Sequence, residues 1–442
     1  MLRHLGGSAF RRNVSWQFIG SMTQSALSGL VLLVMAHGLG AEGFGQYSII
    51  IGFITVANLL MEPRMQDVSA RAFWNLGSDP AARPGHRETF VDFVAFELTA
   101  KLLPLLGLVL LAVPIAALAN LPPGSALLIA IAAGGNFFAK VGYGVSTGVL
   151  RVLGRSDQFT FCGSGELLAR MLVMLVLMQL GQLTVATSVI TLSATLTLSN
   201  LVQLWLAARH LGGVRETLAQ WRLASSAPRL AAHKRQLLSN IGLSAADLMN
   251  KDLDITLLSP VMPAETIGVY KMAKNIALIT WRAVDPFYLA LMPELSRRVQ
   301  MSDYPGTRSL IRRSIIGLGA LAVSLSAAAF ITVWLAGTQL FGPEFGGIPP
   351  LLALMLVGIV GSAPLVWGHP LTVALNRTDA AFVGSLIGSA IGLATFFVLV
   401  PLMGIRGAAI SWSLSFLPAF WYTAYIARGL LARRANEALP IA

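Results

Sequence analysis

The chain has 442 residues, of which 55% are hydrophobic and only 12% are charged, and its mean hydropathy is +0.70. These values exclude a soluble globular domain and are typical of an integral membrane protein. Thirty-two Lys and Arg against twenty Asp and Glu give a net charge of +12, which in a soluble protein would suggest nucleic-acid binding. The single cysteine, Cys162, excludes a disulfide framework. The sequence contains no GxxxxGK[ST] phosphate loop, which argues against ATP hydrolysis by this chain.

Apolar runs long enough to cross a bilayer follow one another along the chain, so the fold class is predicted to be all-α and integral to the membrane. The first run follows a basic N-terminus and lacks a small-residue cleavage site, which predicts a retained transmembrane helix rather than a signal peptide. Twelve transmembrane helices are expected, at residues 14–36, 44–62, 92–118, 124–149, 160–180, 184–208, 238–259, 267–291, 311–336, 348–373, 380–401 and 405–427.

The basic residues predict the orientation of these spans, because cytoplasmic loops carry an excess of Lys and Arg. If the N-terminus is cytoplasmic, the inner loops and the two ends collect 24 of the 32 basic residues. The alternate loops hold only Arg406. We therefore expect both termini in the cytoplasm.

Two short motifs recur at about half the chain length. AExxGxY occurs at 41–47 and again at 264–270, an offset of 223, and LGRSD at 153–157 resembles LNRTD at 375–379, an offset of 222. This spacing predicts two six-helix lobes related by pseudo-two-fold symmetry along the membrane normal. The predicted domains are an N-terminal lobe at 1–208, a basic cytoplasmic connector at 209–236, and a C-terminal lobe at 237–442.

Small residues recur every four positions on the eleventh span. Gly384, Gly388 and Gly392 form two consecutive small-xxx-small steps. Such steps let two helix backbones approach closely inside a membrane. The pattern predicts that this face packs against another helix.

Thirteen ionisable residues fall inside the predicted spans, where a charge normally faces protein or a water-filled cavity. Two interpretations remain open: structural ion pairs that hold the helices together, or a hydrated cavity whose basic groups bind an anionic substrate. The basic residues are Lys101, Lys140, Arg170, Lys251, Lys271, Lys274 and Arg282, and the acidic residues are Glu97, Glu166, Asp247, Asp252, Asp254 and Asp285.

Helical spacing predicts how some of these charges are arranged. Glu97 with Lys101 and Glu166 with Arg170 are acid-then-base pairs at i,i+4. On the seventh span, at about 100° per residue, Asp247, Lys251 and Asp254 would form one stripe, and Asp252 would lie to one side of it.

The charged residues of the eighth span are mostly basic. They would share one arc of the helix, and they are Lys271, Lys274, Arg282 and Asp285. A short loop joins spans seven and eight, so an antiparallel hairpin would place Asp254 near the depth of Lys271 and Lys251 near the depth of Lys274. Pro286 removes a backbone hydrogen bond and is expected to kink the helix.

Several stretches resemble one family when they are taken in order. They are HGLGAEGFGQYSI (37–49), PRMQDVSAR (63–71), GVLRVLGRSDQF (148–159), ETIGVYKMAKNIA (265–277), LTVALNRTDAAFVGSLIG (371–388) and LVPLMGIRGAAIS (399–411). The chain is similar to the polysaccharide-biosynthesis branch of the multidrug/oligosaccharidyl-lipid/polysaccharide (MOP) exporter superfamily, the lipid-linked oligosaccharide flippases. The resemblance extends over essentially the whole chain.

The resemblance implies a two-lobe transporter with a central cavity, located in the bacterial inner membrane. Such proteins move an undecaprenyl-pyrophosphate-linked oligosaccharide from the cytoplasmic to the periplasmic leaflet by alternating access, for surface or exopolysaccharide biosynthesis. The seven basic residues would then meet the pyrophosphate, and the six acidic residues would pair with them or couple transport to H⁺ or Na⁺. No other cofactor and no metal is implied. The implied partners are membrane lipid, the lipid-linked glycan, and the polysaccharide polymerase and export machinery.

Three other functions are weighed against a flippase of lipid-linked oligosaccharide. A cation-coupled multidrug exporter of the same superfamily should have a cavity dominated by acids. A lipid II flippase usually has helices beyond the twelve expected here. A membrane glycan polymerase or ligase usually carries one large periplasmic loop, and every predicted outer loop is short. We therefore expect a transporter rather than an enzyme.

Overall fold

The computed structural model describes residues 7–60, 64–76, 84–219, 237, 240–242, 244, 251–375, 377 and 379–437. Within these residues every regular element is a helix and no strand occurs, which confirms the predicted all-α class. The chain divides into two compact units. The N-terminal unit comprises Met1–Leu39 and Gln46–Ala245, and the C-terminal unit comprises Gly40–Gly45 and Ala246–Ala442.

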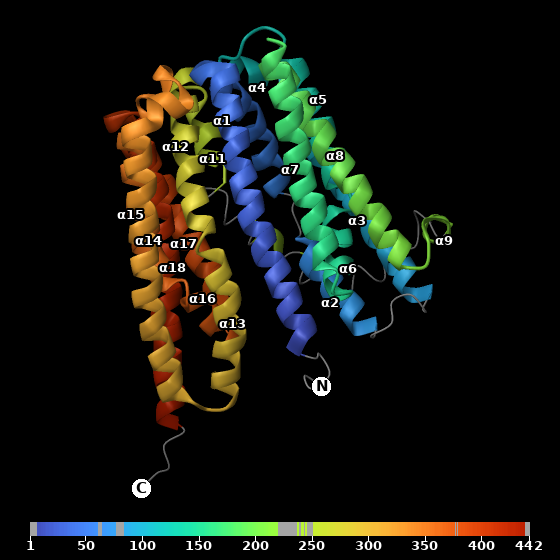
Figure 1. Cartoon of the computed structure of the whole chain (residues 1–442), viewed down its shortest axis with the longest axis vertical. Coiled ribbons are helices and arrows are strands. Elements are labelled where there is room, and N and C mark those ends of the chain that lie inside the picture. Colours follow the sequence, from blue (N-terminus) through green and yellow to red (C-terminus); the bar gives the residue numbers. More distant parts are fainter. Residues whose placement is uncertain are drawn as a thin grey trace. The chain divides into compact units, whose positions relative to one another are not determined.

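The N-terminal unit is a bundle in which α5 and α7 both pack against α8 (Figure 1). The long helix α1 passes through both units, because its residues Gly40–Gly45 belong to the C-terminal one. The helices that begin in the N-terminal unit are α1 (Gly7–Leu60), α2 (Met65–Leu76), α3 (Pro84–Leu110), α4 (Ala112–Leu118), α5 (Ser125–Lys140), α6 (Tyr143–Val152), α7 (Ser156–Gln179), α8 (Val185–His210) and α9 (Val214–Leu218).

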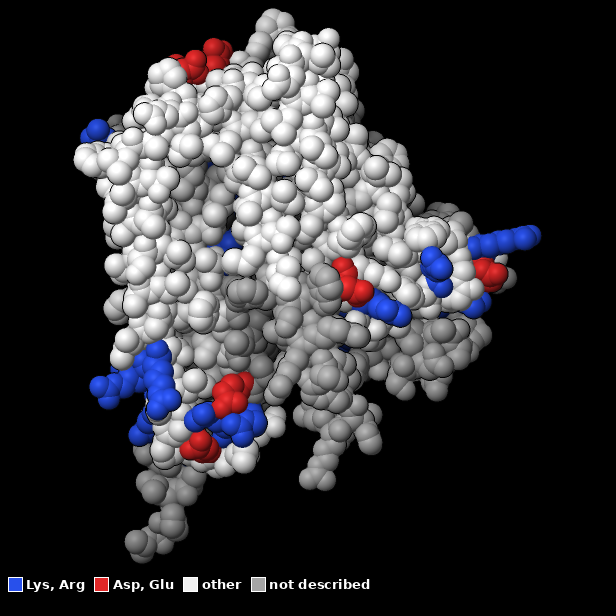
Figure 2. All heavy atoms as spheres, viewed as in Figure 1, with Lys and Arg blue, Asp and Glu red and all other residues white. Residues whose placement is uncertain are grey.

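The C-terminal unit is a second bundle, in which α18 packs along α15 and α17. Its helices are α11 (Leu253–Leu258), α12 (Ala264–Arg282), α13 (Asp285–Gln300), α14 (Tyr304–Phe341), α15 (Ile348–Ser362), α16 (Gly368–Ala374), α17 (Asp379–Met403) and α18 (Ile405–Glu437), with short 3-10 helices η3 (Pro343–Phe345) and η4 (Ala363–Leu365). Figure 2 shows Lys and Arg side chains gathered near the lower ends of α13 and α14, whereas the middle of this unit's visible face is almost without charge.

A single residue, Gly40, makes the turn that the sequence predicts between the first two spans. Its backbone has φ 64° and ψ −178° inside α1, and helix continues directly on both sides of it. Glycine is suited to this conformation because it has no Cβ. The predicted loop of several residues is therefore wrong, and the two spans meet at a kink.

In the described residues, eight helices are long and apolar enough to cross a membrane, and the first of them, at 19–59, covers two predicted spans. Nine of the twelve expected spans thus fall on these helices. Nine of the 22 residues of the seventh, among them 245–250, lie outside the described residues. The eighth and twelfth correspond to α12 and α18, which do not reach the same apolarity, so the total of twelve stays a prediction. The protein is a multi-pass membrane protein by this measure.

Two helices depart from the expected spans: α2 forms where only an inner loop was expected, and α13 begins inside the eighth expected span, 267–291, and continues nine residues beyond it. α2 buries Met65, Val68, Ala72 and Phe73 on one face and packs against α6. α13 buries Leu291, Leu295 and Val299 and packs against α16. Both are amphipathic helices with apolar residues three or four positions apart, and with 12 and 16 residues both are too short to be candidate membrane spans.

The predicted glycine contact is confirmed, and its partner is α18. A methyl group at Gly384 would lie 2.8 Å from the carbonyl oxygen of Ala419, and one at Gly392 would lie 2.6 Å from Ser415 Cβ. At Gly388 it would collide with the Ser415 carbonyl. The three glycines therefore allow α17 and α18 to pack backbone against backbone.

The order of helices repeats along the chain with nearly the spacing of the two motifs. α5 and α15 begin 223 residues apart, at Ser125 and Ile348, and α7 and α17 also begin 223 apart, at Ser156 and Asp379. α6 and α16 lie between these pairs in the same order. This agreement supports the duplication that the sequence motifs predict.

Candidate functional site

Three charged residues of the seventh expected span, Lys251, Asp252 and Asp254, lie at the start of α11. Lys251 and Asp252 occupy a turn, and Asp252 is the residue that precedes the first turn of α11. The predicted stripe of Asp247, Lys251 and Asp254 is therefore wrong for Lys251. Asp247 lies outside the described residues.

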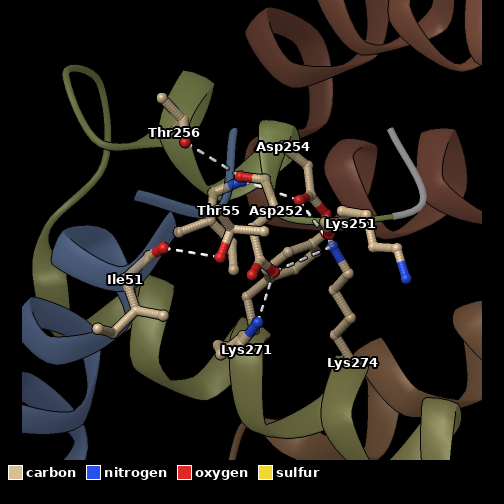
Figure 3. A network of polar contacts seen from close by, with 10 residues as sticks. Ile51, Thr55, Lys251, Asp252, Asp254, Thr256, Lys271 and Lys274 are labelled. Atoms are coloured by element: carbon tan, nitrogen blue, oxygen red, sulfur yellow. Dashed lines mark hydrogen bonds and ion pairs between the residues drawn. The ribbon is translucent and has the colours of Figure 1, made fainter. Parts of the chain in front are cut away.

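Asp254 is the centre of a fully buried polar cluster between α11 and α12. Lys274 Nζ lies 2.7 Å from its Oδ1 and 2.8 Å from its Oδ2, and the Tyr270 hydroxyl donates to Oδ2 at 2.5 Å (Figure 3). The Ile255 amide donates to Oδ1 at 2.9 Å. Asp254, Tyr270 and Lys274 are each 0% exposed. A buried carboxylate needs this many donors to offset the loss of water.

Asp252 and Lys271 form a second, partly accessible ion pair beside the first. Lys271 Nζ lies 2.5 Å from Asp252 Oδ1, with 16% and 14% of the two side chains exposed. Lys274 Nζ lies 3.8 Å from the same Oδ1, so it links the two pairs. This pair is the part of the cluster that a ligand can reach.

Lys274 also donates to the backbone carbonyl of Lys251, and this bond ties the turn before α11 to α12. The Lys251 side chain is exposed and directed away from the two aspartates (Figure 3). Two lysines, Lys271 and Lys274, thus face two aspartates, and their formal charges cancel. The ion-pair interpretation holds for Lys274 in this conformation, because its amine is enclosed and fully hydrogen-bonded.

The structure gives the ion pairs across the hairpin, for which the sequence predicted only similar depths. Asp254, expected near the depth of Lys271, pairs with Lys274 one turn further along α12, and Asp252 pairs with Lys271. The reason is that the prediction assumed an unbroken helix from 238 to 259, whereas Lys251 and Asp252 form a turn before α11 begins at Leu253. The expected proximity of Lys251 and Lys274 is confirmed, although the backbone of Lys251 makes the contact.

Lys271 and Arg282 are accessible on one face of α12. They are eleven residues apart, which on a regular helix corresponds to about 20° of rotation and about 16 Å of rise. Arg282 is exposed, and among the described side chains it makes no ion pair. The helix is interrupted by a turn at Ala283 and Val284, and α13 begins at Asp285. The helix interruption that Pro286 predicts is therefore confirmed. The side chain of Asp285 is not described.

The N-terminal unit contains its own charged pair, which was predicted. Arg170 Nη2 lies 3.2 Å from Glu166 Oε2, and the Thr195 hydroxyl donates to Glu166 Oε1 at 2.9 Å. Glu166 is 7% exposed. The i,i+4 pair is confirmed, and it joins α7 to α8 through Thr195.

The other predicted charges of this unit lie on α3 and α5. Glu97 and Lys101 are both buried on α3, and a methyl group at Gly144 would lie 2.7 Å from Glu97 Oε1. Lys140 ends α5, with its Nζ 5.0 Å from the centroid of the Tyr143 ring, a cation–π arrangement. Glu97 and Lys101 are therefore buried within their own unit, whereas Lys140 is half-buried.

Tyr270 is the residue of the buried cluster that the sequence analysis missed. It is the last residue of the second AExxGxY motif, and its hydroxyl reaches Asp254. A buried tyrosine usually finds a partner for its hydroxyl. The sequence did contain a signal for this hydrogen bond, because a tyrosine in the repeated motif follows a predicted span that carries acidic residues.

The sequence matches no protein-family model and no curated protein. Solved structures, in contrast, resemble the fold over nearly its whole length. An inward-facing multidrug resistance MATE family transporter of the MOP superfamily has a TM-score of 0.70 at 14% identity, covering 94% of this chain and 96% of its own. The lipid II flippase MurJ in an inward closed conformation has a TM-score of 0.68 at 10% identity, covering 96% of this chain and 90% of its own.

A MATE in the bent conformation is also similar, with a TM-score of 0.63 at 14% identity, covering 97% of this chain and 96% of its own. These solved proteins are named as transporters and a flippase, and none of the three is named as an enzyme. At such low identity the likeness concerns the fold and not the substrate. The chain has the fold that MATE transporters of the MOP superfamily share with the lipid II flippase MurJ.

Proposed function

We propose that the chain is a membrane transporter of the MOP type that moves an undecaprenyl-pyrophosphate-linked oligosaccharide from the cytoplasmic to the periplasmic leaflet by alternating access. The fold likeness to a flippase and the ordered sequence stretches support this proposal. The observation that carries it is the accessible cationic face of α12, formed by Lys271 and Arg282. A pyrophosphate is the group that such a face attracts.

Within this proposal the charges of the C-terminal unit have two different roles. Lys271 and Arg282 contact the pyrophosphate, whereas Lys274 and Asp254 hold α11 against α12. Asp252 competes with the substrate for Lys271, because it is already 2.5 Å from that amine. This competition limits the affinity for the pyrophosphate and favours its release.

The remaining basic positions are proposed with a smaller role. Lys251 is exposed and could meet the same substrate. Lys101 and Arg170 are buried or paired in the N-terminal unit, and Lys140 lies on Tyr143. They contribute to substrate binding only in a conformation that uncovers them.

The proposed setting is the bacterial inner membrane with both termini in the cytoplasm. The basic inner loops and ends favour this orientation. The proposed partners are membrane lipid, the lipid-linked glycan, and the polymerase and export machinery that would use the translocated repeat unit. The product would then serve surface or exopolysaccharide synthesis.

A cation-coupled multidrug exporter is the second candidate, favoured by the likeness to MATE transporters and by Asp252. The two candidates differ in what Asp252 does. In an exporter its carboxylate would bind the coupling H⁺ or Na⁺, and Asp252→Asn would abolish transport. In the flippase Asp252→Asn removes a competitor of the pyrophosphate, and substrate binding becomes tighter.

The direct test uses the full chain in liposomes that contain the lipid-linked oligosaccharide. A membrane-impermeant glycosidase reports the fraction of glycan in the outer leaflet with time, and protein-free liposomes give the background. We expect protein-dependent exposure of the glycan. If the glycan moves between leaflets no faster than in protein-free liposomes, while the same protein exports a cationic dye, the multidrug exporter would be the correct function and the flippase would be excluded.

The cellular test is deletion of the gene. A flippase mutant should lose surface glycan and accumulate lipid-linked repeat units, and a plasmid copy should restore both. Normal surface glycan without accumulation, in a strain that has no second flippase, would contradict the proposed substrate.

A further inference from the structure

The C-terminal unit contains a cavity of about 650 Å³ away from the α11–α12 cluster. It lies between α14 and α18, beside the residue that precedes α16. Its polar lining consists of Arg308, Arg312 and Arg428, and its apolar lining consists of Ile311, Ile315, Ile316, Trp367, Leu431 and Ala432.

The lining follows helical periodicity on both walls. On α14 the residues at 308, 311, 312 and 315 form one stripe, and on α18 the residues at 428, 431 and 432 form another. Residues three and four apart share one helix face. The cavity is therefore built by two amphipathic helix faces that meet at Trp367.

The charge in this cavity is of one sign. None of its lining residues is acidic. Arg308, Arg312 and Arg428 are exposed, and within the described part of the chain none of them makes an ion pair. Three guanidinium groups with a shared opening attract an anion that can accept several hydrogen bonds, such as a phosphate.

Trp367 provides a second, independent observation. Its side chain is only 4% exposed, yet its indole Nε1 has no hydrogen-bond acceptor among the described residues. A buried N–H without an acceptor is unfavourable. Since Trp367 lines the cavity, an occupant with ester or phosphate oxygens could supply the acceptor.

The position along α14 indicates that the occupant is a lipid. Arg308 and Arg312 precede the apolar part of the helix, and Ile315 and Ile316 are exposed on it. Arginines at a cytoplasmic helix end lie at headgroup level, and exposed isoleucines one turn further lie at acyl level. Along α14 the lining thus changes from basic to apolar in the direction in which a phospholipid does.

We propose that this cavity binds the phosphate-bearing headgroup and the adjoining acyl region of an acidic glycerophospholipid from the cytoplasmic leaflet. The three arginines hold the headgroup, the isoleucines contact the acyl chains, and an oxygen of the lipid accepts from Trp367. The bound lipid joins α14 to α18. This site is separate from the α12 face, and the lipid is not the transported substrate.

The test is lipid titration of the full-length protein, purified in detergent and followed by native mass spectrometry. The probes are phosphatidylglycerol, phosphatidylcholine and inorganic phosphate. We expect one tightly bound phosphatidylglycerol and at least tenfold weaker phosphatidylcholine. Each of Arg308→Gln, Arg312→Gln and Arg428→Gln should lower the phosphatidylglycerol affinity about fivefold, and the triple variant about 100-fold.

Two variants keep the test independent of folding. Arg313→Gln removes the same charge from α14 next to the cavity, because Arg313 is exposed but not part of the lining, and its affinity should stay within twofold of the wild type. Trp367→Phe keeps an aromatic ring but removes the N–H, and it should weaken phosphatidylglycerol binding without changing the net charge.

Three results would overturn the proposal. Equal binding of phosphatidylcholine would remove the role of the headgroup charge. Equal losses for Arg313→Gln and the lining arginines would show a diffuse surface effect. Complete displacement of the lipid by millimolar inorganic phosphate would make a free anion the occupant.

Discussion

Gly45 and Gly268 occupy the same position in the two copies of the AExxGxY motif, and each lies against the backbone of the other copy. A methyl group at Gly45 would collide with the carbonyl oxygen of Ala264, and one at Gly268 with that of Ala41. The contact is reciprocal, as in an interface with two-fold symmetry. All four residues belong to the C-terminal unit.

This contact predicts that neither glycine tolerates a side chain. Gly45→Ala or Gly268→Ala should lower the free energy of unfolding by about 1–3 kcal/mol, because a backbone carbonyl cannot move aside as a flexible side chain can. Thermal unfolding of the purified protein in detergent measures the effect. Gly317→Ala on α14 is the control, since a methyl group there meets nothing within 4 Å. Unchanged stability of both motif variants would contradict the close packing.

A second prediction concerns the buried pair of Asp254 and Lys274. Asp254→Asn leaves the Lys274 charge buried without its counter-charge, which should cost about 3–5 kcal/mol. Lys274→Met should cost a similar amount for the converse reason. The double variant Asp254→Leu with Lys274→Met should recover much of the loss, because no buried charge remains.

The measurement for this pair is a double-mutant cycle on thermal unfolding and on the yield of monodisperse protein. Asp379→Asn is the control, because its ion pair with Arg377 is exposed and its removal should change stability by less than about 1 kcal/mol. Additive losses in the double variant would mean that the two residues do not depend on each other.

The sequence was informative wherever a local rule determines the structure. Gly384, Gly388 and Gly392 indicated a helix contact from their spacing alone, and Glu166 with Arg170 formed the expected pair. The repeated motif stands out in the sequence because residues such as Gly45 and Gly268 are constrained by a backbone contact, and the duplication that it indicates stays a prediction. These features depend on spacing within one helix or on repeated motifs.

The sequence failed where the chain departs from regular helix. The pairing of Asp254 with Lys274 could not be predicted, because the turn at Lys251 and Asp252 changes the helical phase. Helix α2 was missed because a search for apolar runs does not detect an amphipathic helix, although the spacing of Met65, Val68 and Ala72 indicates one. The burial of Lys274 depends on packing that spacing cannot reveal.

A third prediction separates substrate binding from folding on α12. Lys271→Gln and Arg282→Gln should each reduce glycan translocation in liposomes by about tenfold or more, because each removes a charge-assisted hydrogen bond worth about 1.5–3 kcal/mol. Thermal unfolding should change little, since both side chains are accessible.

Arg313→Gln is the matched control for this experiment, because it removes one exposed basic charge from another helix of the same unit. Lys274→Gln should instead lower the yield of folded protein. Normal translocation by the Lys271→Gln, Arg282→Gln double variant would remove α12 from the proposed substrate path.

A fourth prediction concerns the kink in α1. The Ala41 amide donates to Glu344 Oε2 at 2.7 Å, so a carboxylate from η3 caps the helix segment that begins after Gly40. Both groups belong to the C-terminal unit. Loss of such a cap costs about 0.5–2 kcal/mol. Glu344→Ala should therefore lower the unfolding temperature, and Glu344→Gln should lower it less because the amide oxygen still accepts.

Glu265→Ala is the control for this cap, since it removes an exposed acid of the same unit for which no such contact is seen within the described residues. Gly40→Ala tests the same kink by changing the glycine instead of the carboxylate. The alanine Cβ would lie 2.7 Å from Glu344 Oε2, and the alanine backbone would have to adopt φ +64°. The substitution should therefore destabilise the protein, even though the chain on both sides of residue 40 is helical. If Glu344→Ala and Glu265→Ala unfold alike, the carboxylate does not hold the kink, and the conformation of Gly40 alone must do so.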